Sequence, residues 1–148
     1  MRQTAQQNWL AVLVDDDIHS ARMLVRTFAE FEPGLPKWLG GASRGQRLLQ
    51  TRFKAERGNW PALVIVDLKS TSTSTANFIA SIRPMAQACG AIIVAIAPSI
   101  EKPVRDVLHA AGAAAVFQRW DELELYRQEV ADIISFWVRN QHLDAVGT

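Results

Sequence analysis

The sequence predicts an α/β fold: a single doubly wound, five-stranded parallel sheet with helices on both faces. Four short runs rich in Val, Ile, Leu or Ala are continuous rather than alternating, which is typical of strands buried on both faces. The segments that follow them carry apolar residues three and four positions apart, the spacing of a helix with one buried face. Strand and helix alternate five times, and this alternation indicates a parallel sheet with right-handed crossovers.

The expected strands lie at residues 9–14, 37–39, 62–66, 91–97 and 113–117. The second is the shortest, and Pro36 and the pair Gly40-Gly41 bound it. The expected helices lie at residues 18–31, 43–53, around 78–82, 99–111 and about 122–140. Ser43 and Ser99 are the expected N-caps of the second and fourth helices. Pro84 disfavours the last turn of the third, because proline cannot donate a helical hydrogen bond.

Length, charge and composition exclude several classes of protein. The 148 residues fit one domain, expected over residues 9–143, with an N-terminal extension at 1–8 and a C-terminal tail at 144–148. The formal net charge of +1 is too small to favour nucleic-acid binding. No apolar run approaches the roughly 20 residues of a membrane helix, and the first residues lack the apolar core of a signal peptide. With a single cysteine, Cys89, the chain is expected to be cytoplasmic and soluble.

Acidic residues end the first and third expected strands. Asp15, Asp16 and Asp17 close the first, and Asp67 closes the third, two residues before Lys69. The carboxyl ends of parallel strands share one edge of the sheet, where ligands bind, so Asp15, Asp16 and Asp67 are expected to converge. Converging carboxylates make a hard oxygen site suited to magnesium. The alternative is that the triplet caps the next helix and that Asp67 is a turn residue.

These features resemble the receiver domain of two-component response regulators, over about residues 9–143. The parts that carry the resemblance are Val12-Leu13-Val14-Asp15-Asp16-Asp17 at the first strand and the runs at 61–68, 91–97 and 110–113. Their order and spacing together are more specific than any single run. The resemblance implies the flavodoxin-like receiver fold.

The resemblance also implies a role for each acid. Asp67 would accept a phosphoryl group from a histidine kinase or a phosphotransfer protein, as a mixed anhydride. Asp15 and Asp16, with Asp67 itself, would hold the magnesium that neutralises charge on the transferring group. The main-chain carbonyl of Lys69 falls where the family supplies a further metal ligand. Asp17 is expected to cap the following helix.

Three departures from the family pattern surround this site. Ile96 stands where the family has a Thr or Ser that hydrogen-bonds the phosphoryl group, and Val116 replaces the switch aromatic of the fifth strand. Arg119 stands for the Lys that pairs with a phosphoryl oxygen; it keeps the charge on a larger planar group. Lys69 lies near enough in sequence to swing towards a phosphoryl group. We therefore expect an intact acceptor joined to an altered switch.

A finer resemblance is to stand-alone receivers that partner bacterial phytochromes. It is carried by the pair Phe136-Trp137 and by the lengthened stretch at residues 51–60. It implies a phytochrome-like sensor histidine kinase as partner, and a homodimer through the fourth helix, fifth strand and fifth helix.

The last helix also indicates an interface from its own residues. Phe136 shares a face with Glu129 and Asp132, and an apolar side chain rimmed by charge can mark a contact surface. Across a two-fold axis these acids could meet basic residues of the fourth helix. The alternative is a set of solvated charges around one exposed aromatic ring. The residues expected in the interface are Lys102, Arg105, Trp120, Glu129, Asp132 and Phe136.

Three hypotheses about function follow. The first is a phosphoaccepting receiver, favoured by the three acids Asp15, Asp16 and Asp67. The second is a pseudo-receiver that works as a protein-interaction or dimerisation module without phosphorylation, favoured by Ile96 and Val116. The third is a small magnesium-dependent phosphoryl-transfer enzyme, which lacks a general acid and a Gly-rich phosphate loop in this sequence. We therefore do not expect an enzyme.

Overall fold

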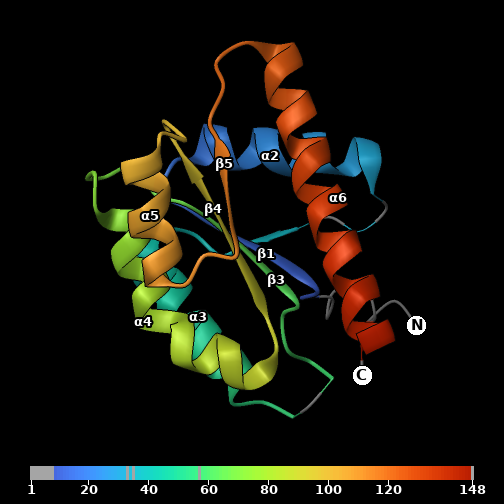
Figure 1. Cartoon of the computed structure of the whole chain (residues 1–148). Coiled ribbons are helices and arrows are strands. Elements are labelled where there is room, and N and C mark those ends of the chain that lie inside the picture. The colour runs from blue at the N-terminus through green and yellow to red at the C-terminus, as the bar shows by residue number, and fades with distance from the viewer. Residues whose placement is uncertain (1–8, 33, 35, 57, 148) are drawn as a thin grey trace.

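The computed structural model describes residues 9–147 except 33, 35 and 57, and confirms the predicted fold class. Five parallel strands form one sheet in the order β2-β1-β3-β4-β5 (Figure 1). The strands are β1 (Ala11–Asp15), β2 (Lys37–Trp38), β3 (Leu63–Asp67), β4 (Ile92–Ala97) and β5 (Ala115–Gln118). The extension predicted for residues 1–8 lies outside the described residues.

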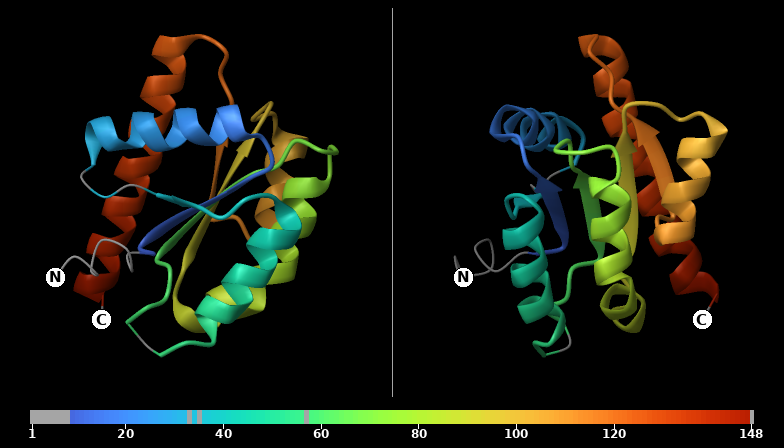
Figure 2. Two further views of the ribbon diagram at one scale, coloured as in Figure 1. Left: turned by 180° about the vertical axis from the view of Figure 1, so that it is seen from behind. Right: turned by 90° about the vertical axis from the view of Figure 1, so that its left-hand side faces the viewer.

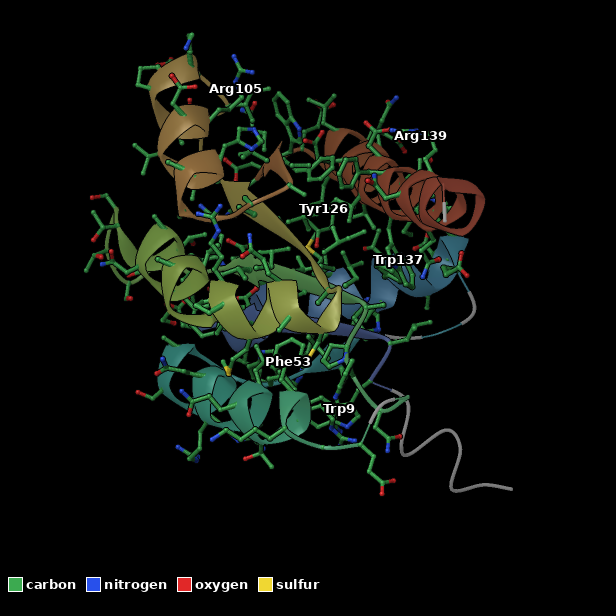
Figure 3. All side chains as sticks on the ribbon, turned by 60° about the horizontal axis from the view of Figure 1, so that its bottom comes forward. Trp9, Phe53, Arg105, Tyr126, Trp137 and Arg139 are labelled. Atoms are coloured by element: carbon green, nitrogen blue, oxygen red, sulfur yellow. The ribbon has the colours of Figure 1, made fainter. Side chains whose placement is uncertain are left out.

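Helices cover both faces of this sheet. The helices are α2 (Ile18–Phe31), α3 (Ala42–Phe53), α4 (Ser74–Cys89), α5 (Lys102–Ala111) and α6 (Leu123–Gly147). α3, α4 and α5 pack on one face and α2 and α6 on the other, as the two views of Figure 2 show. In Figure 3, Trp9 and Phe53 lie beside α3, whereas Tyr126 and Trp137 lie beside α6. The doubly wound, three-layer arrangement is that expected from the alternation of strands and helices.

The two central strands explain the continuous apolar runs. Every residue of β1 and of β3 is buried, because helices cover both faces of these strands. In the β1–β3 pairing Asp15 lies opposite Asp67. The register therefore brings the last residues of both strands side by side at the carboxyl edge of the sheet.

Two predicted helix caps are wrong. α3 begins at Ala42 with Gly41 as N-cap and no side-chain capping bond, so Ser43 lies inside the first turn. α5 begins at Lys102 after Glu101, and Pro103 occupies its first turn, where a missing N–H costs least. Ser99 instead accepts a hydrogen bond from the Glu101 N–H at 3.1 Å, which orders the loop before the helix.

Two helices are longer than predicted. α4 continues through Pro84 to Cys89, because buried Ile82 and Ala86 hold the helix on both sides of the proline while Pro84 itself is exposed. Water can then hydrate the carbonyl group that the proline leaves without a donor. α6 runs to Gly147 and includes residues 144–147, where a tail was expected. None of the helices in the described part of the chain is long and apolar enough to cross a membrane.

Candidate acidic site at the sheet edge

The acids at the ends of β1 and β3 occupy different environments. Asp15 and Asp67 are buried, with 1% and 4% of their surfaces exposed, whereas Asp16 and Asp17 are exposed. Asp17 caps α2: its Oδ1 accepts hydrogen bonds from the His19 N–H at 2.9 Å and the Ser20 N–H at 3.3 Å. These bonds favour the ionised carboxylate and lower the pKa of Asp17. The predicted cap is thereby confirmed.

Lys69 contacts both buried acids. Its Nζ lies 2.7 Å from Asp15 Oδ1 and 3.2 Å from Asp67 Oδ2, and it donates a hydrogen bond to the main-chain carbonyl of Asp67 at 3.1 Å. Arg119 contacts the other oxygen of Asp67: Nη2 lies 2.5 Å and Nε 3.1 Å from Oδ1. Two cations thus balance the two buried carboxylates.

Asp16 ties the loop after β3 to the end of β1. Its carboxylate accepts hydrogen bonds from the main-chain N–H groups of Lys69 and Ser70, each at 3.1 Å. On the other side of the loop, the buried Thr75 hydroxyl accepts from the Leu68 N–H at 3.0 Å and lies 3.2 Å from the Leu68 carbonyl. The segment from Ser70 to Thr75 is therefore anchored at its first residue by Asp16 and at its last residue by Leu68.

Burial dominates the electrostatics of Asp15. Desolvation raises the pKa of its carboxyl group, and the charge of Asp67 adds to this, while hydrogen bonds from Lys69 and from the Asp17 N–H oppose it. Its second oxygen, Oδ2, is buried and has no hydrogen-bond partner among the residues that the structure describes. An unsatisfied buried carboxylate oxygen is costly, so a ligand that satisfied it would stabilise the site.

The donor atoms at this edge suit a hard divalent cation. Asp15, Asp16, Asp67 and the carbonyl of Lys69 offer only oxygen, and Asp15 Oδ2 still lacks a partner. In the described part of the chain, however, no three acidic, imidazole or thiol groups are gathered as a ready-made metal cluster. The Lys69 ammonium stands between Asp15 and Asp67, and Asp16 is bonded to main-chain N–H groups. The residues therefore fit a metal ion if Lys69 moves aside.

A cavity of about 530 Å³ adjoins the two cations, between the loop after β3 and the first turns of α5. Lys69 and Arg119 are among its lining residues. Its lining also includes Thr71 and Thr73 of the loop and apolar residues of α5 such as Val104. The cationic side of the acid site therefore has open space beside it, enough for a phosphoryl group to approach.

The two residues predicted to alter the switch, Ile96 and Val116, are both aliphatic and at least half-buried. Ile96 is buried in the core beneath α2 and α6. Val116 is half-buried and packs against the core on the opposite face. Neither side chain offers a hydroxyl group or an aromatic ring at the acid site.

Five of the six predicted interface residues already have partners within the chain. Phe136 packs edge-on against Phe117 with ring centroids 6.2 Å apart, so it is half-buried rather than free. Glu129 accepts hydrogen bonds from the Gln118 N–H at 2.7 Å and from Trp120 Nε1 at 3.3 Å. On α5, Lys102 pairs with Asp106 and Arg105 donates a hydrogen bond to the Ile100 carbonyl, whereas Asp132 of α6 is exposed. Dimerisation through this face stays a prediction.

Two contacts at the site were not foreseen from the sequence. Lys69 bridges both buried acids, and Trp38 Nε1 donates a hydrogen bond to the Asp15 carbonyl at 2.8 Å. The first had a signal: Lys69 follows Asp67 by two residues, and side chains two apart on an extended chain share a side. The second had none, because it depends on how β2 docks beside β1.

Solved structures of response regulators, and one of a bacterial pilus assembly-related protein, share this fold. The Mn(2+)-bound form of response regulator Rcp1 matches with a TM-score of 0.67 and 17% identity, over 88% of this chain and 94% of that chain. The phosphorylated cyanobacterial phytochrome response regulator RcpA matches with a TM-score of 0.64 and 16% identity, over 86% and 92%. A pilus assembly-related protein from Burkholderia pseudomallei matches with a TM-score of 0.67 and 13% identity, over 88% and 90%.

The sequence alone gives no comparable match. A scan against protein-family models finds none, and neither does a search of curated proteins. At the low identities of the structural matches, the likeness establishes the fold. The chain thus has the α/β receiver fold of response regulators, as its sequence resemblance implied.

Proposed function

We propose that the chain is a signal receiver in which Asp67 accepts a phosphoryl group from a histidine kinase or a phosphotransfer protein. One observation carries this proposal: the buried Asp67 carboxylate ends β3 between Arg119 and Lys69, beside an open cavity. A nucleophile that attacks phosphorus needs cations at hand, because negative charge spreads over the transferring group. Arg119 and Lys69 meet that requirement.

Transfer would proceed by displacement at phosphorus. An oxygen of Asp67 forms a bond to phosphorus as the phosphorus–nitrogen bond of a phosphohistidine breaks, and the imidazole leaves with the bonding pair. Arg119, already 2.5 Å from Asp67 Oδ1, orients the carboxylate and can follow the charge onto the phosphoryl oxygens. A magnesium ion held by Asp15, Asp16 and the Lys69 carbonyl would neutralise further charge at that site.

The partner follows from this chemistry. A chain that accepts a phosphoryl group as a signal needs a protein that donates one, and we propose a phosphohistidine of a kinase or phosphotransfer protein as that donor; we do not assign the chain a catalytic turnover of its own. The match to a phytochrome response regulator supports a phytochrome-like kinase as donor. We further assign the protein to the cytoplasm and propose a homodimer through α5, β5 and α6, in which the exposed Asp132 of α6 faces basic residues of α5 in a second copy.

A pseudo-receiver is the second candidate function, and a specific observation favours it. The two buried acids are already neutralised by Lys69 and Arg119, so the site is complete as an electrostatic unit without a phosphoryl group. Ile96 and Val116 also remove the side chains that would report phosphorylation. In that case the fold would act as a constitutive protein-interaction module.

Intact-protein mass spectrometry separates the two candidates. The protein is incubated with magnesium and acetyl phosphate, beside Asp67→Asn and beside Asp106→Asn, which changes an exposed acid of α5. A receiver gains one phosphoryl group in the native chain and in Asp106→Asn, and none in Asp67→Asn. Folded protein that gains nothing, from this donor or from phosphoramidate, contradicts phosphoacceptance and supports the pseudo-receiver.

A further inference from the structure

Lys69 occupies the position in which a cation relieves the repulsion between the two buried acids. Its Nζ contacts Asp15 Oδ1 at 2.7 Å and Asp67 Oδ2 at 3.2 Å. We infer that Lys69 is a built-in counter-cation: it holds the acid pair together without metal, and it must leave before a divalent cation binds. Lys69 would then set the metal affinity of the site. This inference rests on the metal site of the proposed function.

The backbone forces the two acids together. Asp15 and Asp67 are register partners in neighbouring strands, and such strands lie about 4.8 Å apart. Both side chains are almost fully buried, so water screens their repulsion poorly. Two like charges in that position need a cation between them or a proton on one of them.

Lys69 is the group that joins them, whereas Arg119 is not. Of the two buried acids, the Arg119 guanidinium bonds Asp67 and not Asp15, and it does so through a single oxygen. Lys69 contacts a carboxylate oxygen of each acid and, in addition, the main-chain carbonyl of Asp67. An ammonium with three oxygen partners from two strands takes the place that a small hard cation would otherwise hold.

Lys69 can also move out. Its side chain is 24% exposed and belongs to the loop after β3, and its flexible four-carbon stem can carry the ammonium into solvent. Its departure would uncover Asp15 Oδ1 and Asp67 Oδ2 beside the unpartnered Asp15 Oδ2. A metal ion can bind only after the contacts of Lys69 with the two acids are broken, and the free energy of breaking them weakens metal binding. The native chain should therefore bind metal weakly.

Direct titration with Mn²⁺, followed by electron paramagnetic resonance of the free ion, tests this without any phosphoryl donor. Lys69→Met keeps most of the apolar stem and removes the charge, Lys69→Arg keeps the charge, and Lys54→Met removes an exposed lysine at the end of α3. We expect Lys69→Met to bind Mn²⁺ about tenfold more tightly or better, the change that follows when about 1.4 kcal/mol of competing attraction is removed. Lys69→Arg and Lys54→Met should stay close to the native affinity.

Thermal unfolding in a chelator gives a second readout. Lys69→Met should unfold at a lower temperature than the native chain, and added Mn²⁺ or Mg²⁺ should restore more of that loss than it adds to the native chain. The inference is overturned if Lys69→Met binds Mn²⁺ no more tightly than the native chain, or if metal stabilises both to the same extent. Either result leaves phosphorylation of Asp67 to be judged separately by the mass measurement.

Discussion

The contact between Arg119 and Asp67 makes a quantitative prediction. Arg119→Met, Asp67→Asn and the double variant form a thermodynamic cycle that isolates the energy of this contact. Both guanidinium donors use the same oxygen, Asp67 Oδ1, so we count one charged hydrogen bond rather than two. A hydrogen bond to a charged group contributes about 1.5–3 kcal/mol. The Arg119 side chain is 26% exposed, which places its contribution at the low end.

Lys69 lowers the cost further. After Arg119 is removed, Asp67 Oδ2 still faces the Lys69 ammonium at 3.2 Å, so the buried carboxylate is not left without a counter-charge. We therefore expect a coupling energy of about 1.5 kcal/mol, less than the 3–5 kcal/mol lost when a fully buried pair is broken. Urea unfolding, followed by tryptophan fluorescence, measures it with adequate precision in a domain of this size. Additivity of the two single changes within about 0.3 kcal/mol would refute the contact.

Three further predictions concern the fold around the site. Asp17→Ala should destabilise α2 by removing its N-cap. Because folding lowers the pKa of Asp17, the stabilisation by its carboxylate is complete above the unfolded pKa of 3.8 and is lost as the pH falls below it. The native chain and Asp17→Ala should therefore differ in urea midpoint at neutral pH and differ less in acid. Gly45→Val should cost about 1–3 kcal/mol in urea unfolding through overpacking, since a Cβ there lies 3.0 Å from Val14 Cγ1; an unchanged midpoint would contradict the close packing of α3 on β1. Pro84→Ala should raise the free energy of unfolding by about 1–2 kcal/mol, because it restores a helical donor at an exposed position of α4, partly offset by greater unfolded-state entropy; a lower thermal midpoint would contradict this.

Most of the fold could be predicted because its signals are strong and local. Strands β1 and β3 are buried on both faces, so their apolar runs are continuous, and the helix at Ile18–Phe31 was predicted with its observed bounds. Local signals failed where tertiary packing overrides them. Pro84 does not end α4, because the core contacts of Ile82 and Ala86 outweigh the loss of one hydrogen bond.

The site could be predicted in its acids but not in its cations. The ends of two parallel strands bring Asp15 and Asp67 together wherever those strands are neighbours, so topology was sufficient. The position of the Lys69 ammonium depends on the conformation of a flexible side chain in a loop. The position of the Phe136 ring depends on its packing against Phe117 of the edge strand β5. Such positions follow from three-dimensional packing, which sequence spacing does not specify.

The central claim is that Asp67 carries the phosphoryl group, and chemical trapping tests it at the level of the residue. Borohydride reduces an aspartyl phosphate to homoserine but leaves a free carboxylate unchanged. After treatment with acetyl phosphate and magnesium, followed by borohydride, peptide mass mapping should find homoserine at position 67 in the native chain and Asp in a sample without donor. Homoserine at Asp15 or Asp16 instead, or none in folded protein, would contradict the account.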